Sequence, residues 1–106
     1  MSHIKPHPHF YADLTFVSPF TVGEPPINLS FRGELDLGIS GMQHMAYIVL
    51  NRGQEANRSA QSGITLLFPE YQAGRLKQDL QFTVYSGPQL IARASVTEIA
   101  DEALRA

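Results

Sequence analysis

The sequence predicts a single all-β domain, built as a barrel or a sandwich. Three observations carry this prediction. Apolar and polar residues alternate in six separate runs, which is the period of a strand with one buried face. No segment shows a convincing helical period. At 106 residues the chain is long enough for one modest core and shows no linker, so residues 1–106 are expected to form one domain.

The first three predicted strands differ in their patterns. Residues 10–16 alternate strictly between apolar side chains and more polar ones. Residues 27–39 repeat the alternation but contain Gly33, which suggests a bulge or sharp bend within one long strand. Residues 45–50 are more uniformly apolar, and this predicts a strand that is covered on both faces.

Three further strands are predicted at residues 64–68, 80–84 and 90–96. Ser86-Gly87-Pro88 separates the last two and reads as a short hairpin connection. The last strand carries alanines at every second position, which suits the tight interior of a small barrel. Residues 18–26 and 51–63 read as exposed loops, and residues 103–106 could form about one turn of helix. The residues expected in the interior include Phe10, Leu14, Phe16, Leu66, Phe82 and Val84.

The composition excludes several classes of function. The net charge of −2 and a pI near 6.0 give no global attraction to nucleic acid or anionic lipid. There are no cysteines for disulfides, thiolate zinc sites or thiol nucleophiles. No run approaches the length of a membrane span, and the first residues lack the apolar region of a signal peptide, so we expect a cytoplasmic protein.

The histidines near the start allow two interpretations. His7 and His9 would project to the same side of an extended segment, and His3, His44 or a carboxylate could complete a site for zinc or nickel. Alternatively, the stiff proline-rich segment is simply the entry to the first strand. We favour the second interpretation and expect that folding needs no metal.

Catalytic and nucleotide-binding patterns are absent from the sequence. It contains no G-x-S-x-G, Walker or G-x-G-x-x-G motif, and Asp13, Asp36 and Asp79 read as solvated carboxylates on or beside strands. We therefore expect no enzyme activity, no cofactor and no bound nucleotide. The cations are not clustered along the chain, which argues against nucleic-acid binding; they include Arg32, Arg52, Arg58, Arg75, Lys77 and Arg93.

The segment IKPHPHFYADLTFVS, residues 4–18, resembles the start of the C-terminal β-barrel of elongation factor Tu. That domain begins with I-K-P-H followed by F-x-A-x-V-Y-V-L-S. Residues 30–37 resemble the family's G-Y-R-P-Q-F-Y-F, and residues 79–96 resemble its closing hairpin. The resemblance covers nearly the whole chain and implies a closed, six-stranded, mainly antiparallel Greek-key barrel. It also implies that the histidines belong to an interdomain connection.

The chain departs from this family at the loops that contact aminoacyl-tRNA. Glu24 occupies the place of an arginine, and the two arginines of the closing hairpin correspond to Tyr85 and Gln89. An anion beside a phosphate is repulsive, so the resemblance implies a stand-alone relative that has lost the tRNA surface. We expect a non-catalytic protein-binding module, a decoy or regulator of elongation factor partners. An RNA- or tRNA-binding accessory protein is the alternative.

A stand-alone barrel must also cover the surface that the family packs against its other domains. Apolar residues remain in candidate surface stretches, namely Val22, Pro25, Pro26, Met42, Met45 and Tyr47. Because large apolar patches are uncommon on monomers, we expect a homodimer that pairs through this face. The candidate partner-contact residues are Glu24, Arg32, Met42, Met45, Tyr85 and Gln89.

Overall fold

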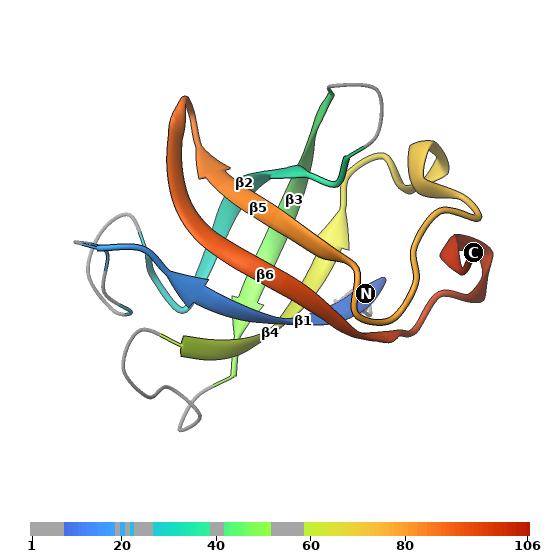
Figure 1. The fold of residues 1–106 in the computed structure, drawn as a ribbon, viewed down its shortest axis with the longest axis horizontal. Helices are drawn as coiled ribbons and strands as arrows, with labels where there is room; N and C mark the ends of the chain where they lie inside the picture. Colours follow the sequence, from blue (N-terminus) through green and yellow to red (C-terminus); the bar gives the residue numbers. More distant parts are fainter. Residues whose placement is uncertain (1–7, 19, 21, 23–26, 39–41, 52–58) are drawn as a thin grey trace, which may run out of the picture.

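The computed structural model is a closed barrel of six strands, and every neighbouring pair is antiparallel (Figure 1). The structure describes residues 8–18, 20, 22, 27–38, 42–51 and 59–106. The strands follow one another around the barrel in the order β1-β4-β3-β2-β5-β6. Three consecutive strands, β2 to β4, pair in sequence, and β1 lies beside β4, which is a Greek-key arrangement. The expected all-β fold and the closed barrel are confirmed.

The elements have the following bounds: β1 Phe10–Phe16, β2 Ser30–Asp36, β3 Gln43–Leu50, β4 Ser59–Leu66, η1 Pro69–Gln72, β5 Gln81–Ser86, β6 Gln89–Ile99 and η2 Glu102–Leu104. β1 pairs with both β4 and β6, and the pairing with β6 closes the barrel. The predicted hairpin is present, since β5 and β6 are joined by Gly87 and Pro88, with Gly87 at a φ of 60°.

One core fills the barrel, and alternation along the strands supplies most of it, with consecutive buried residues on β4 and β6. Phe10 and Phe82 meet edge to face within it, with ring centroids 5.9 Å apart. Small side chains on β1, β4 and β6, such as Ala12, Ala60 and Ala92, allow these rings to fit the narrow interior. All the predicted interior residues are buried, namely Phe10, Leu14, Phe16, Leu66, Phe82 and Val84.

Of the two features expected at Gly33, a bulge or a sharp bend within the strand, the bulge is wrong. β2 pairs with β3 without interruption from Ser30 to Asp36. A Cβ atom at Gly33 would lie 3.2 Å from Ile48 Cδ1 and 3.2 Å from Val84 Cγ1, so the glycine leaves room for these two side chains inside the barrel. The register shifts occur elsewhere, between Tyr11 and Ala12 on β1 and between Val84 and Tyr85 on β5.

Several predicted strand bounds need correction. In the described part of the stretch 27–39, which ends at Gly38, only residues 30–36 form a strand. Leu80 lies just before β5 and packs partly against the core. β4 begins at Ser59, inside the predicted loop 51–63. This polar stretch is held in the sheet because its backbone pairs with β1. The buried Ser62 hydroxyl also donates a hydrogen bond to the carbonyl oxygen of Ala12 at 2.9 Å. β6 continues to Ile99, beyond the predicted end.

β3 is not covered on both faces, contrary to expectation. Its inward residues Ala46, Ile48 and Leu50 are buried, but Tyr47 and Val49 on the outer side are about half exposed. No described element packs over this outer face. The apolar run at residues 45–50 therefore supplies two faces of β3, one that packs in the core and one that is apolar but exposed to solvent.

One end of the barrel is closed by the segment that contains η1 and by the C-terminal segment, which lie together at the right of Figure 1. The amide of Gly74 donates to the carbonyl oxygen of Ala103 at 2.9 Å, and the amide of Leu76 donates to that of Leu104 at 2.8 Å. The turn of helix expected at residues 103–106 is a 3-10 turn at Glu102–Leu104, η2, whose start is capped by the Asp101 carboxylate. In the described part of the chain, no helix is long and apolar enough to cross a membrane.

Candidate interaction surface

The large apolar side chains exposed on the described residues lie on one part of the molecule. They have exposed fractions between 40% and 55% and belong to β3 or its start, the end of β4 and η1. They are Met42, Tyr47, Val49, Leu67, Phe68 and Tyr71. Isolated exposed apolar residues are ordinary, but a cluster of this kind indicates a binding surface.

Local geometry joins these side chains into a continuous band. Alternation along β3 directs Met45, Tyr47 and Val49 outward. The amide of Leu67 donates to the carbonyl oxygen of Met45 at 3.1 Å, so Leu67 continues the band next to β3. The rings of Phe68 and Tyr71 then meet edge to face, with centroids 6.4 Å apart. We call this band the β3–η1 face and define it as Met42, Met45, Tyr47, Val49, Leu67, Phe68 and Tyr71.

A hollow of about 150 Å³ lies at the η1 end of the face. Its lining consists of Met42, Gln43, His44, Met45, Phe68 and Tyr71. His44 is only 7% exposed, its ring lies 6.3 Å from that of Tyr71, and its Nε2 atom has no hydrogen-bond partner among the described residues. A space of this size and character suits one apolar or aromatic side chain. Methionines and aromatic rings can adapt their shape to such a group.

Opposite charges border the β3–η1 face on β2. Arg32 is directly opposite Tyr47, and Glu34 is directly opposite Met45. Glu34 is also opposite Tyr85 on β5, and its Oε1 atom accepts a hydrogen bond from the Gly87 amide at 3.0 Å. The border therefore presents one cation and one anion at neighbouring outward positions.

The structure brings together four of the six candidate contact residues. Arg32, Met42, Met45 and Tyr85 lie on or beside the outer face of β3, β2 and β5. Gln89 lies at the β5–β6 turn opposite Ser86, one residue from Tyr85 and farther from β3. Glu24 lies outside the described residues, as do Pro25 and Pro26, and Val22 packs partly against the core.

Sequence reasoning missed the contribution of η1 to this face. The strand expected at residues 64–68 would place Phe68 on the same side as the buried Leu66, yet Phe68 is 54% exposed because β4 ends at Leu66. Pro69 then begins η1, which carries Tyr71 back toward the start of β3. The signal available was Phe68-Pro69, since proline is disfavoured inside a paired strand.

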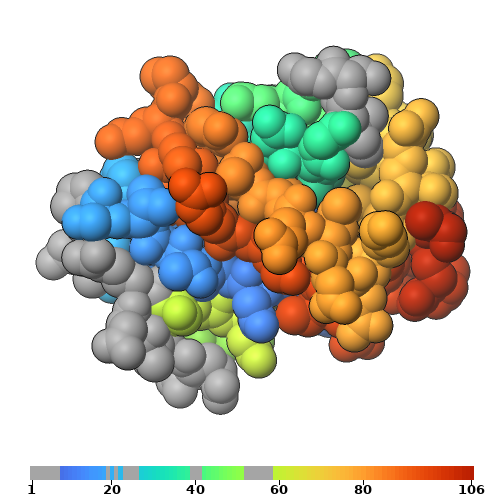
Figure 2. Space-filling view, in the orientation of Figure 1, coloured from blue at the N-terminus to red at the C-terminus, as the bar shows by residue number. Residues whose placement is uncertain are grey.

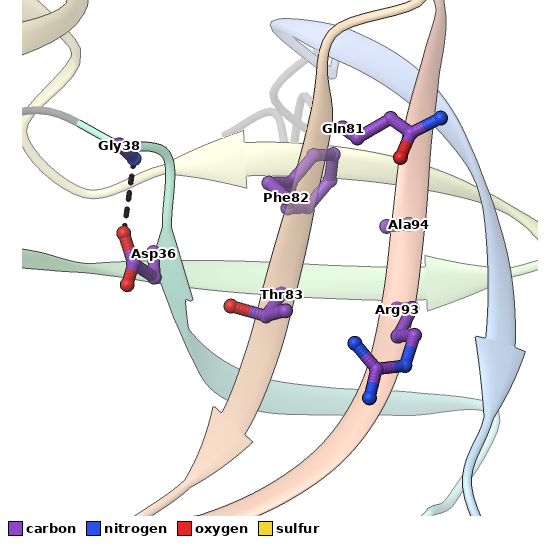
Figure 3. Close-up of a pocket in the computed structure, with 7 residues that line it drawn as sticks. All are labelled: Asp36, Gly38, Gln81, Phe82, Thr83, Arg93 and Ala94. Carbon is purple, nitrogen blue, oxygen red and sulfur yellow. Dashed lines mark hydrogen bonds between the residues drawn. The ribbon is translucent and has the colours of Figure 1, made fainter.

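A second, polar hollow of about 320 Å³ lies across β2, β5 and β6 (Figure 3). Asp36 is opposite Thr83, which is opposite Arg93, and the Asp36 carboxylate accepts a hydrogen bond from the Gly38 amide at 2.9 Å. β5 and β6 cross the side of the molecule shown in Figure 2, in orange and red. No histidine is among its lining residues.

His9 has a structural role at the entry to β1. Its Nδ1 atom accepts a hydrogen bond from the Leu66 amide at 2.9 Å, and its carbonyl oxygen accepts from Ala100 and Asp101. His3 and His7 lie outside the described residues. Within the described ranges, no three His, Asp or Glu side chains come together in a way that could hold a metal ion. His9 thus ties β1 to β4 and to the C-terminal segment.

Replacing His9 by alanine is expected to destabilise the protein more than replacing it by asparagine. The alanine leaves the partly buried Leu66 amide without its acceptor, whereas the asparagine Oδ1 can occupy the place of Nδ1. The two variants should differ by about 1 kcal/mol in the free energy of unfolding, measured by urea denaturation. Equal stabilities would show that this hydrogen bond does not contribute.

Neither the protein-family models nor the curated proteins include a match to this chain. The class of protein is therefore defined by the structure: a closed six-stranded antiparallel barrel with an apolar face on β3 and η1.

Proposed function

We propose that this chain is a non-catalytic protein-binding module that binds through the β3–η1 face. The observation that carries the proposal is the continuity of the exposed side chains along β3, the end of β4 and η1. Methionine, tyrosine and phenylalanine are enriched at the centres of protein interfaces and scarce in large patches on monomers. The adjoining hollow offers a place for an anchoring side chain of the partner.

The charges around this face favour protein over RNA as the partner. Exposed aromatic rings can stack on bases, but RNA binding also needs cations that follow the phosphate backbone. The cation beside the face, Arg32, is accompanied by the anion Glu34, and Glu70 lies within η1. The other described cations are spread over the molecule. Arg93 is on β6, and Arg105 is paired with Glu102 at 3.1 Å. Arg75 and Lys77 flank Leu76, which pairs with the C-terminal segment.

The resemblance to the C-terminal barrel of elongation factor Tu suggests a more specific role. The resemblance is carried by residues 4–18, 30–37 and 79–96, together with the closed barrel. On this basis we propose a cytoplasmic, translation-related relative that acts as a decoy or regulator of proteins that engage the elongation factor.

Site-specific photocrosslinking tests whether the face binds protein. A benzoylphenylalanine is placed at Phe68 within the face, or at the exposed Thr15 on β1 as the control. After irradiation in an extract of the source cells, we expect discrete protein adducts from position 68 and none from position 15. The adducts should persist after nuclease treatment and disappear when Tyr47→Lys is added.

Two outcomes of this experiment would contradict the proposal. Equal labelling from positions 68 and 15 would show that the β3–η1 face has no special affinity. Adducts that contain RNA and vanish after nuclease treatment would instead support the alternative function, an RNA-binding accessory protein.

A further inference from the structure

The β3–η1 face carries a projecting group and a receiving hollow at neighbouring outward positions of one strand. Tyr47 projects from β3 with 49% of its surface exposed. Met45, two residues earlier on the same side of the strand, lines the 150 Å³ hollow together with Met42, Phe68 and Tyr71. The face therefore presents a ring and a space that can receive a ring.

The bordering charges on β2 follow the same spacing. Arg32 is in register with Tyr47, and Glu34 is in register with Met45. The cation thus accompanies the projecting ring, and the anion accompanies the hollow. Ala46 lies midway between Met45 and Tyr47 on β3, and Gly33 lies midway between Arg32 and Glu34 on β2. Gly33 and Ala46 are directly opposite each other in the register. Both residues are buried and have no outward side chain.

A single two-fold axis matches both pairs of features. The axis lies just outside the sheet, parallel to its surface and perpendicular to the strands, and passes over Gly33 and Ala46. Rotation about it lays β2 and β3 of one copy over β2 and β3 of the other, with the strands running in the opposite direction. Tyr47 of each copy then faces Met45 and the hollow of the other, and Arg32 faces Glu34. Oε1 of Glu34 already accepts from Gly87, which leaves Oε2 for the guanidinium.

We propose that the partner of the β3–η1 face is a second copy of this chain, paired about the axis above Gly33 and Ala46. This inference rests on the proposed function, because it uses the same face. The pairing is isologous, so each contact occurs twice and the assembly closes at two copies. Opposite charges at the border fix the register, while the rings and methionines supply the buried apolar surface.

Charge reversal on β2 tests the register directly. In sedimentation equilibrium at micromolar concentrations, the purified chain should have a mass of twice 11.7 kDa. Arg32→Glu places like charges opposite each other on both sides of the axis, and Glu34→Arg does the same. Each single variant should weaken dimerisation by about tenfold or more, whereas the double variant, which exchanges the two charges, should return to within about threefold of the original affinity.

Controls separate this effect from misfolding and from general charge effects. Arg93→Glu reverses an exposed charge on β6 and should leave dimerisation unchanged. Urea denaturation checks that every variant is folded; if a charge variant is not, Tyr47→Lys provides the comparison, because it removes the projecting ring and should give a monomer.

Two results would overturn the inference. The first is a mass that stays near 11.7 kDa as the purified protein is concentrated. The second is a dimer that the double variant fails to restore, which would exclude this axis. Neither result would refute the proposed function, because photocrosslinking from position 68 to a different protein would still show that the face binds protein.

Discussion

Replacing Phe82 by alanine is expected to lower the free energy of unfolding by about 3–5 kcal/mol, the range for a large side chain removed from a packed core. Phe82 is 4% exposed on β5, and its ring packs edge to face against that of Phe10. The alanine would leave a cavity. The strands cannot move inward to fill it, because each strand of the closed barrel is hydrogen-bonded to two neighbours.

Urea denaturation of Phe82→Ala measures this loss, and Phe68→Ala provides the matched control. Both substitutions remove a phenylalanine ring, but Phe68 is 54% exposed on the β3–η1 face. The control variant should change stability by no more than about 0.5 kcal/mol when measured on the monomer. A loss below about 1 kcal/mol for Phe82→Ala would contradict its assignment to the interior.

Replacing Gln72 by methionine is expected to raise the free energy of unfolding by about 1–3 kcal/mol, the cost of burying an unpaired amide. Gln72 is fully buried at the end of η1, and neither its Nε2 nor its Oε1 atom has a partner among the described residues. Methionine has a similar length and volume, so the substitution removes the polar group while preserving the packing.

The matched control is Gln81→Met, at an exposed position of β5. Thermal and urea denaturation should show stabilisation for the first substitution and little change for the second. If Gln72→Met instead destabilises the protein, the amide is hydrogen-bonded in solution and contributes to holding η1 against the barrel end.

Alternation of apolar residues was sufficient to predict six strands and the interior of the barrel. It could not assign the polar residues 59–63 to β4, because their place in a strand depends on backbone pairing with β1, which is distant in sequence. The bulge expected at Gly33 was wrong for a similar reason. The pattern shows a missing side chain, but only the fold shows that Ile48 and Val84 fill the space.

The candidate surface was only partly predictable. Met42 and Met45 could be recognised as candidates from residue type, but a strand that is apolar on both faces looks the same whether its outer face is buried or meets solvent. Phe68 and Tyr71 reach the surface through the break at Pro69 and the direction of η1, neither of which has a periodic signal. These features depend on how the chain returns to the start of β3.

The pairing of β1 with β6 also determines when the barrel can form. Phe10 pairs with Ile99, so the first strand finds its second neighbour only after nearly the whole described chain is present. Closure of such a large loop is entropically costly, and proteins dominated by distant strand pairs fold in milliseconds to seconds. A chain that emerges slowly from the ribosome would hold β1 and β5 with open edges until β6 arrives. During that interval, unpaired edges can join those of other chains, so folding yield should depend on synthesis rate and on chaperones.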